Sequence, residues 1–279
     1  MSTLKKTLAK KIDAWRPRTI KLVKEHADLE IGKVTIGQAL GGMRGVKCLV
    51  TDISYLDPFE GIRFRGYTIP EVLEKLPKPP GAEIPYVEGF IYLLLTGDIP
   101  TKKEVKEVMH EMVSRRNVPD YVYKVLDDLA ECHPMVMFSA AVVSMEKESI
   151  FTPKYKKMEI GKMDLWDPTF EDSLNLLAKL PRIGAYIYRK KYKNGDIIPG
   201  DPKLDWGGNF ARMMGIGKPY DDLARLYFIL HSDHESGNVS AHTGHLVASA
   251  LSDVYYSISS MINGLAGPLH GLANEMVLR

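Results

Sequence analysis

The sequence lacks several features that would indicate a specialised class of protein. Its two cysteines, Cys48 and Cys132, show no CxxC spacing and cannot form a disulfide framework, so we expect a reducing compartment. With 37 Lys and Arg against 35 Asp and Glu, the formal charge is +2, which provides no extended basic surface for nucleic acid or an anionic membrane. No apolar run approaches the roughly 20 residues that span a bilayer.

The 279 residues are 45% hydrophobic and 26% charged, which is typical of a globular protein with a large core. Most of the apolar periodicity is helical, so we expect an all-α fold. Residues 34–36 and 48–53 are the strand-like runs, separated by the turn-prone glycines at 41–42, and they predict a small antiparallel β-ribbon near the N-terminus.

Local signals place several helix boundaries. Gly97 follows the apolar stretch 86–96 and predicts a helix end. Thr101 and Glu104 have the spacing of a capping box. Pro119 and Pro134 fit the first turns of two further helices. Pro181 interrupts the apolar-periodic stretch 170–192, which predicts either a kink or two abutting helices.

The basic N-terminus resembles a transit peptide in composition. However, Leu4, Leu8, Ile12 and Trp15 fall at helical spacing, so we expect a retained amphipathic helix and not a targeting segment.

Five of the eight histidines lie between His231 and His270, and this run is the candidate for acid/base or anion-binding chemistry. His270 stands between a glycine-rich break and the expected start of a helix, where the helix dipole disfavours imidazolium. A neutral imidazole there could donate a hydrogen bond to a developing enolate oxygen. A buried structural histidine is the alternative.

The segment 231–240 contains the other polar candidates. The spacing of His231 and His234, beside Asp233 and Glu235, resembles that of metal ligands. A pocket for a carboxylated small molecule suits His234, Asn238 and Ser240 better, because imidazole, amide and hydroxyl groups can donate to carboxylate oxygens. Ser240 is also a candidate N-cap for a helix starting at Ala241.

Arg44 lies in the flexible turn GGMRG and could contact a phosphate. A solvated arginine in a turn is an equally good interpretation.

Four motifs together resemble the citrate synthase family, in the longer type found in mitochondria and some bacteria: GGMRG, LDPFEGIRFRG, HSDHESGNVSAHT and NGLAGPLHGLAN. The likeness extends along essentially the whole chain. It implies a large helical domain and the condensation of acetyl-CoA with oxaloacetate, followed by thioester hydrolysis to citrate and CoA. It also implies that the enzyme needs no cofactor and no metal.

The resemblance assigns roles to individual residues. By this likeness His270 hydrogen-bonds the thioester oxygen while the acetyl methyl group loses a proton, and Ser240 orients His270. His234 matches an oxaloacetate ligand, and Asn238 lies in the same substrate-binding motif. Arg44, and Lys162 where the family would have an arginine, match basic residues that reach the CoA phosphates.

The family pattern continues well beyond Arg279, and the later part supplies a second histidine, the aspartate base and carboxylate-binding arginines. We therefore expect residues 1–271 to be the N-terminal part of the large domain and residues 272–279 to start the small domain. Without the base, the 279-residue chain alone is predicted to be inactive. It would be a truncated form, a processed fragment, or half of a split enzyme with a second polypeptide.

Other interpretations stay open from the sequence. A 2-methylcitrate synthase or a citryl-CoA lyase shares the architecture, and a non-catalytic scaffold could retain the fold. The resemblance implies a homodimer, with no nucleic acid or membrane partner. The expected location is a bacterial cytoplasm, and the alternative is the mitochondrial matrix.

Overall fold

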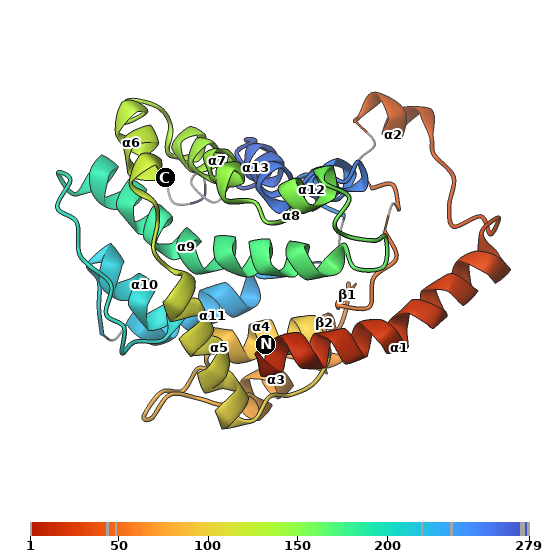
Figure 1. Cartoon of the computed structure of the whole chain (residues 1–279), viewed down its shortest axis with the longest axis horizontal. Helices are drawn as coiled ribbons and strands as arrows, with labels where there is room; N and C mark the ends of the chain where they lie inside the picture. Colours follow the sequence, from red (N-terminus) through yellow and green to blue (C-terminus); the bar gives the residue numbers. More distant parts are fainter. Residues whose placement is uncertain are drawn as a thin grey trace. The chain divides into compact units, whose positions relative to one another are not determined.

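The computed structural model describes residues 2–42, 45–47, 49–218, 220–234, 237–273 and 277. It is mostly helical, with one small three-stranded antiparallel sheet (Figure 1). This confirms the predicted all-α class. The chain forms two compact units.

The first unit comprises Met1–Glu111, Lys203–Gly208 and Pro219–Gly237. Its elements are α1 (Thr3–His26), α2 (Ile36–Leu40), β1 (Ser54–Asp57), β2 (Gly61–Phe64), β3 (Tyr67–Thr68), α3 (Ile69–Lys75), α4 (Val87–Thr96), most of α5 (Lys102–Arg115), the start of α10 (Trp206–Met214), and α11 (Tyr220–Leu230).

The second unit comprises Met112–Pro202, Asn209–Lys218 and Asn238–Arg279. Its elements are α6 (Asp120–Asp128), α7 (Pro134–Ser144), the 3-10 helix η1 (Met145–Glu148), α8 (Phe151–Lys156), α9 (Trp166–Tyr192), α12 (Val239–Ser249) and α13 (Val254–Leu265), together with the ends of α5 and α10.

The β-ribbon lies later in the chain than the sequence predicted. Strands β1, β2 and β3 pair in chain order, with Tyr55 opposite Arg63 and Phe64 opposite Tyr67. The predicted strand at 34–36 is wrong, because Thr35 makes a capping box with Gln38 and starts helix α2. The described residues of the second predicted strand, 49–53, precede β1 and form no strand.

The predicted helix boundaries are confirmed where a capping side chain or a glycine marks them. Gly97 ends α4 in the left-handed conformation, with φ of 80°. The hydroxyl of Thr101 accepts from the Glu104 N–H, and the Glu104 carboxylate accepts from the Thr101 N–H. Pro134 opens α7. Helix α9 runs through Pro181 as one helix, so the alternative of two abutting helices is wrong.

The core of the first unit forms where α4 meets α3, α11 and the ribbon. The rings of Phe64 and Phe90 make an edge-to-face contact with centroids 4.9 Å apart, and Ile229 of α11 packs into the same cluster. Helix α1 contacts α4 and buries Leu4 and Leu8, so the N-terminal helix is amphipathic as predicted.

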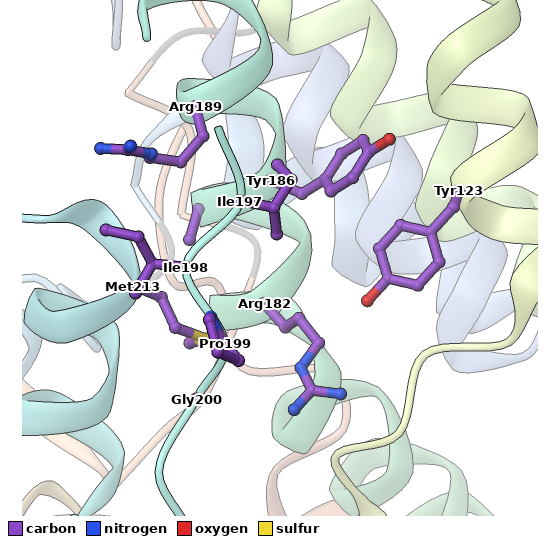
Figure 2. A pocket seen from close by; sticks show the side chains of 10 residues that line it. Tyr123, Arg182, Tyr186, Arg189, Ile197, Ile198, Pro199, Gly200 and Met213 are labelled. Atoms are coloured by element: carbon purple, nitrogen blue, oxygen red, sulfur yellow. The ribbon is translucent and has the colours of Figure 1, made fainter. Parts of the chain in front are cut away.

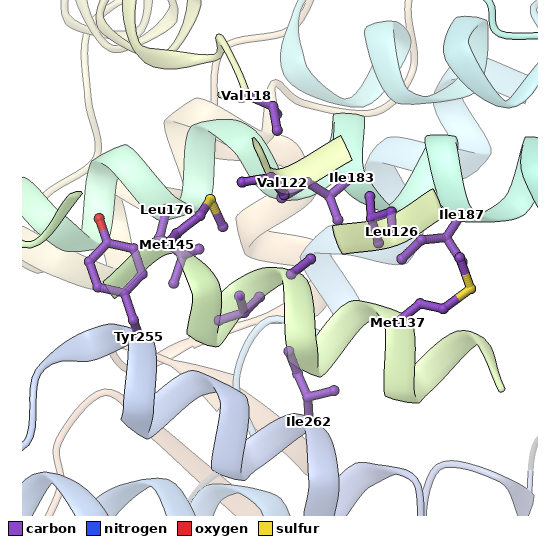
Figure 3. Packing of buried hydrophobic residues seen from close by; sticks show 12 residues of the cluster. Val118, Val122, Leu126, Met137, Met145, Leu176, Ile183, Ile187, Tyr255 and Ile262 are labelled. Carbon is purple, nitrogen blue, oxygen red and sulfur yellow. The ribbon is translucent and has the colours of Figure 1, made fainter. Parts of the chain in front are cut away.

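The core of the second unit surrounds α7. This helix packs against α6, α9 and α13, and α13 packs against α12 (Figure 3). Met137, Met145 and Tyr255 are among its largest fully buried side chains. The consequence for the site is that α13 is anchored in this core, and α12 packs on α13.

No helix in the described part of the chain is long and apolar enough to cross a membrane.

Candidate active site

The start of helix α12 carries two of the predicted site residues. Asn238 is its N-cap, with φ of −98° and ψ of 157°, and its side chain accepts from the Ala241 N–H at 2.9 Å. The predicted N-cap, Ser240, is wrong by two residues. An asparagine oxygen satisfies a free N–H of the first turn at least as well as a serine hydroxyl does, so Asn238 takes that role and Ser240 lies inside the first turn.

Ser240 and His270 form the central contact of the site. The Ser240 Oγ lies 2.8 Å from the His270 Nε2 and 2.7 Å from the Asn238 Oδ1. All three residues belong to the second unit and are partly buried. The structure therefore brings together three of the six predicted site residues, and the orienting role of Ser240 stays a prediction.

Two glycines make this contact possible. A Cβ on Gly264 would lie 3.2 Å from the Ser240 Cα, so the end of α13 could not approach α12 as closely with a larger residue. A Cβ on Gly271 would lie 2.5 Å from the backbone oxygen of Leu265. The Gly271 N–H donates to that same oxygen at 3.0 Å, and this bond folds the turn that carries His270.

His234 belongs to the first unit, in the exposed segment that follows α11. Its neighbour His231 has a structural contact, because its Nδ1 lies 2.9 Å from the backbone oxygen of Tyr227 and its ring stacks on the Tyr227 ring. Both His231 and His234 are exposed. The oxaloacetate-binding role of His234 stays a prediction.

The two basic candidates are at different places in the chain. Arg44 lies outside the described residues. Lys162 is exposed in the turn between α8 and α9, a position that a phosphate in solvent could reach. Neither phosphate-binding role is tested by the structure.

The metal alternative gains no support from the geometry. Within the described ranges, which omit Glu235, no three His, Cys, Asp or Glu side chains are grouped so as to hold a metal ion.

A cavity of about 230 Å³ in the second unit contains none of the predicted site residues (Figure 2). It lies between α6, α9, the segment 197–200 and Met213 of α10. The Arg189 guanidinium at its edge is already paired with Asp196, at 2.7 Å. Burial raises the pKa of the Tyr123 hydroxyl, and the nearby Arg182 partly opposes that rise.

A buried carboxyl in the first unit was missed at the sequence level. Glu88 is 1% exposed; its Oε1 accepts from the Trp206 N–H at 2.7 Å, and its Oε2 has no hydrogen-bond partner among the described residues. Burial, with the nearby Asp205, raises its pKa to about 7. The available signal was a single charged residue inside the apolar stretch 86–96.

Arg225 does not neutralise Glu88 directly. Its guanidinium is committed to Asp205, at 2.7 and 3.0 Å, and to Asp222, at 2.8 Å.

Comparison with solved structures identifies the class of fold. The chain is similar to the citrate synthase of Pyrobaculum aerophilum, with a TM-score of 0.74, 31% identity, and coverage of 88% of this chain and 60% of that one. It is also similar to the citrate synthase of Thermotoga maritima, with a TM-score of 0.67 and 27% identity, over 85% of this chain and 58% of that one. The architecture is therefore that of the helical citrate synthases.

Sequence comparison identifies the family. The model "Citrate synthase, C-terminal domain" matches residues 42–279. The chain is 48% identical over 277 residues to citrate synthase 4, mitochondrial, of Arabidopsis thaliana, covering 99% of this chain and 58% of the relative. It is 50% identical over 278 residues to the mitochondrial citrate synthase of Saccharomyces cerevisiae, with the same coverage of each chain. The chain belongs to the citrate synthase family, and it spans about 58% of the length of these relatives.

Proposed function

We propose that this chain contributes part of a citrate synthase active site, in which acetyl-CoA and oxaloacetate condense to citrate and CoA. The observation that carries the proposal is the 2.8 Å contact between the Ser240 Oγ and the His270 Nε2, in a chain that belongs to the family. With Nε2 engaged by Ser240, the Nδ1 is the nitrogen that remains to face a thioester oxygen. A hydrogen bond to that oxygen stabilises the negative charge that develops when the methyl group is deprotonated.

The other predicted roles complete this proposal. His234 and the NH2 group of Asn238 would donate to carboxylate oxygens of oxaloacetate, since the Asn238 oxygen is already used at the start of α12. Arg44 and Lys162 would pair with the CoA phosphates. No cofactor and no metal are required by this scheme, because proton transfer and oxyanion stabilisation need only side chains.

We propose further that the chain corresponds to the N-terminal portion of the enzyme and that the later portion supplies the base. The shared coverage of about 58% of each relative supports a partial match. Residues 1–271 would then be part of the large domain, and 272–279 would begin the small one.

The proposed enzyme is a homodimer formed through the second unit. Apolar side chains are exposed on three of its helices, namely Val136 and Val143 of α7, Leu246 of α12 and Tyr256 of α13. These side chains are available to a subunit interface, where apolar residues are buried. Sedimentation of the completed enzyme at twice the monomer mass tests this.

We propose the mitochondrial matrix as the location, because the relatives described above are mitochondrial proteins. The expectation of a bacterial cytoplasm has no support from them. Fractionation of the source cells tests the compartment.

The catalytic roles are tested in a completed enzyme, made by fusing this chain to the remaining C-terminal part of the yeast relative. His270→Ala should lower kcat about 10²- to 10⁴-fold, the usual loss of a proton-transfer or oxyanion group. Ser240→Ala removes one neutral hydrogen bond and should lower kcat about fivefold. The assay is CoA release from acetyl-CoA and oxaloacetate.

Ser249→Ala is the matched control, since Ser249 is exposed at the other end of α12 and its hydroxyl donates to the Leu246 carbonyl. If the His270 and Ser249 variants lost activity equally, the assigned role of His270 would be wrong. Faster turnover with propionyl-CoA than with acetyl-CoA would favour a 2-methylcitrate synthase. A completed enzyme that folds but turns over neither substrate would favour a non-catalytic scaffold.

A further inference from the structure

Ser240 has one hydroxyl proton and two possible acceptors for it. Its Oγ lies 2.7 Å from the Asn238 Oδ1 and 2.8 Å from the His270 Nε2. A hydroxyl donates only once, so the two contacts cannot both be made by the Ser240 proton. The direction of one hydrogen bond fixes the direction of the other.

The direction at Asn238 follows from the helix cap. The same Asn238 Oδ1 accepts from the Ala241 N–H at 2.9 Å, so this side-chain atom must be the oxygen and not the amide nitrogen. An amide oxygen only accepts hydrogen bonds. Ser240 therefore donates to Asn238.

The direction at His270 follows in turn. Because the Ser240 proton points to Asn238, the Ser240 Oγ can only accept from His270, and the proton between them belongs to the Nε2. We propose that Asn238 is a positioning residue that acts through Ser240 and holds neutral His270 in the Nε2–H tautomer. This deepens the citrate synthase proposal and rests on it.

The tautomer matters because of what the other ring nitrogen can then do. In a neutral imidazole with its proton on Nε2, the Nδ1 carries a lone pair and accepts hydrogen bonds. It cannot donate to a thioester oxygen. The arrangement shown here is thus a resting arrangement, and a neutral His270 becomes a donor only after the Ser240 hydroxyl turns from Asn238 to the Nε2.

The change conserves protons and needs no other reactant. The Nε2 proton passes to solvent, and the Nδ1 takes a proton from solvent. The Ser240 hydroxyl keeps its proton and turns, so that its hydrogen bond to Asn238 is replaced by one to the Nε2. His270 is only partly buried, so water can serve both nitrogens. Asn238 would therefore set how readily the donating form of His270 is reached.

The proposal is tested by the ring nitrogen signals of His270 in the 279-residue protein labelled with ¹⁵N-histidine. The ¹⁵N chemical shifts identify the neutral ring, and two-bond proton–nitrogen correlation at pH 8 then distinguishes its two tautomers. The His270→Gln spectrum assigns the signals. The wild-type protein is expected to show the Nε2–H form.

Two substitutions of Asn238 separate its effect on the tautomer from its effect on the helix. Asn238→Asp keeps an acceptor for both Ala241 and Ser240 and should keep the Nε2–H form. Asn238→Gly removes the acceptor, at a small cost to the helix because glycine is tolerated at an N-cap. It should shift the tautomer ratio toward Nδ1–H by about fivefold, the value of one neutral hydrogen bond.

An Nδ1–H form in the wild-type protein would overturn the proposal whether or not the variants fold. An unchanged ratio in Asn238→Gly, with the helical circular dichroism intact, would overturn it as well. No substrate is present in this measurement. Its failure would leave the activity assay unaffected, and an inactive completed enzyme would leave the tautomer result standing.

Discussion

At the scale of single residues, the site depends on how three polar side chains share hydrogen bonds. One hydroxyl, that of Ser240, connects the cap of α12 to the imidazole of His270. The motifs predicted that Ser240 and His270 would meet, because the family resemblance carried that information. They could not predict the direction of the hydrogen bonds, since that depends on which residue caps the helix, and Asn238 and Ser240 are both good caps.

Glu88 gives a prediction for pH dependence at the same scale. Its pKa is raised from 4.5 to about 7, so between those values the unfolded chain releases a proton that the folded protein retains. The retained proton of Glu88 stabilises the folded state; this contribution is fully present below pH 4.5 and is lost as the pH rises through about 7. The shift corresponds to about 3 kcal/mol of unfolding free energy.

Glu88→Gln should remove this dependence, because a neutral amide has no charge to desolvate. The stability gain of the variant over wild type should be clearly larger at pH 8 than at pH 5, as measured by urea unfolding at both values. Glu74→Gln, an exposed carboxyl on α3, serves as the control. Parallel stability curves for wild type and Glu88→Gln would contradict the assigned burial of the charge.

At the scale of elements, the helices with local end signals were the predictable part of the fold. Gly97 and the Thr101–Glu104 box act within one turn of chain, so the sequence contains the whole interaction. The β-ribbon was misplaced because short apolar runs near glycines fit a strand or a helix equally well. The capping box between Thr35 and Gln38 stabilises helix α2 at this position.

Continuity of α9 through Pro181 was also not predictable from periodicity. Pro181 is buried in the middle of that helix, so packing against neighbouring helices compensates for the lost backbone hydrogen bond. The position of the proline is visible in the sequence, but the tertiary packing that keeps the helix continuous is not.

The turn after α13 is an element whose geometry we expect to control activity. Gly271→Ala would place a Cβ 2.5 Å from the Leu265 oxygen, so the backbone turn must shift and take His270 with it. A displacement of about 1 Å at a reacting group can cost about 10²-fold. We expect at least a tenfold lower kcat in the completed enzyme, by the CoA-release assay.

Gly267→Ala is the matched control in the same turn. Its Cβ would lie 3.4 Å from the Gly264 oxygen, close to ordinary van der Waals contact. It should retain most of the activity. If Gly267→Ala and Gly271→Ala behaved alike, the close approach at Gly271 would not be what positions His270.

At the scale of the whole molecule, two facts matter: the family of the chain and the part of its relatives that it covers. The chain belongs to the citrate synthases, yet it spans about 58% of the relatives that it matches. We propose that it contains the oxyanion-stabilising histidine and that the remaining part of the enzyme supplies the base. Carbon–carbon bond formation needs both groups at one site.

The most direct test of this account is the turnover of the 279-residue polypeptide with acetyl-CoA and oxaloacetate, alone and with the C-terminal part of the yeast relative. We predict no CoA release from either part alone. Mixing or fusing them should restore turnover, and His270→Ala in this chain should lower it about 10²- to 10⁴-fold. Turnover by the 279-residue polypeptide alone, free of longer forms, would contradict the claim that it carries only part of the site.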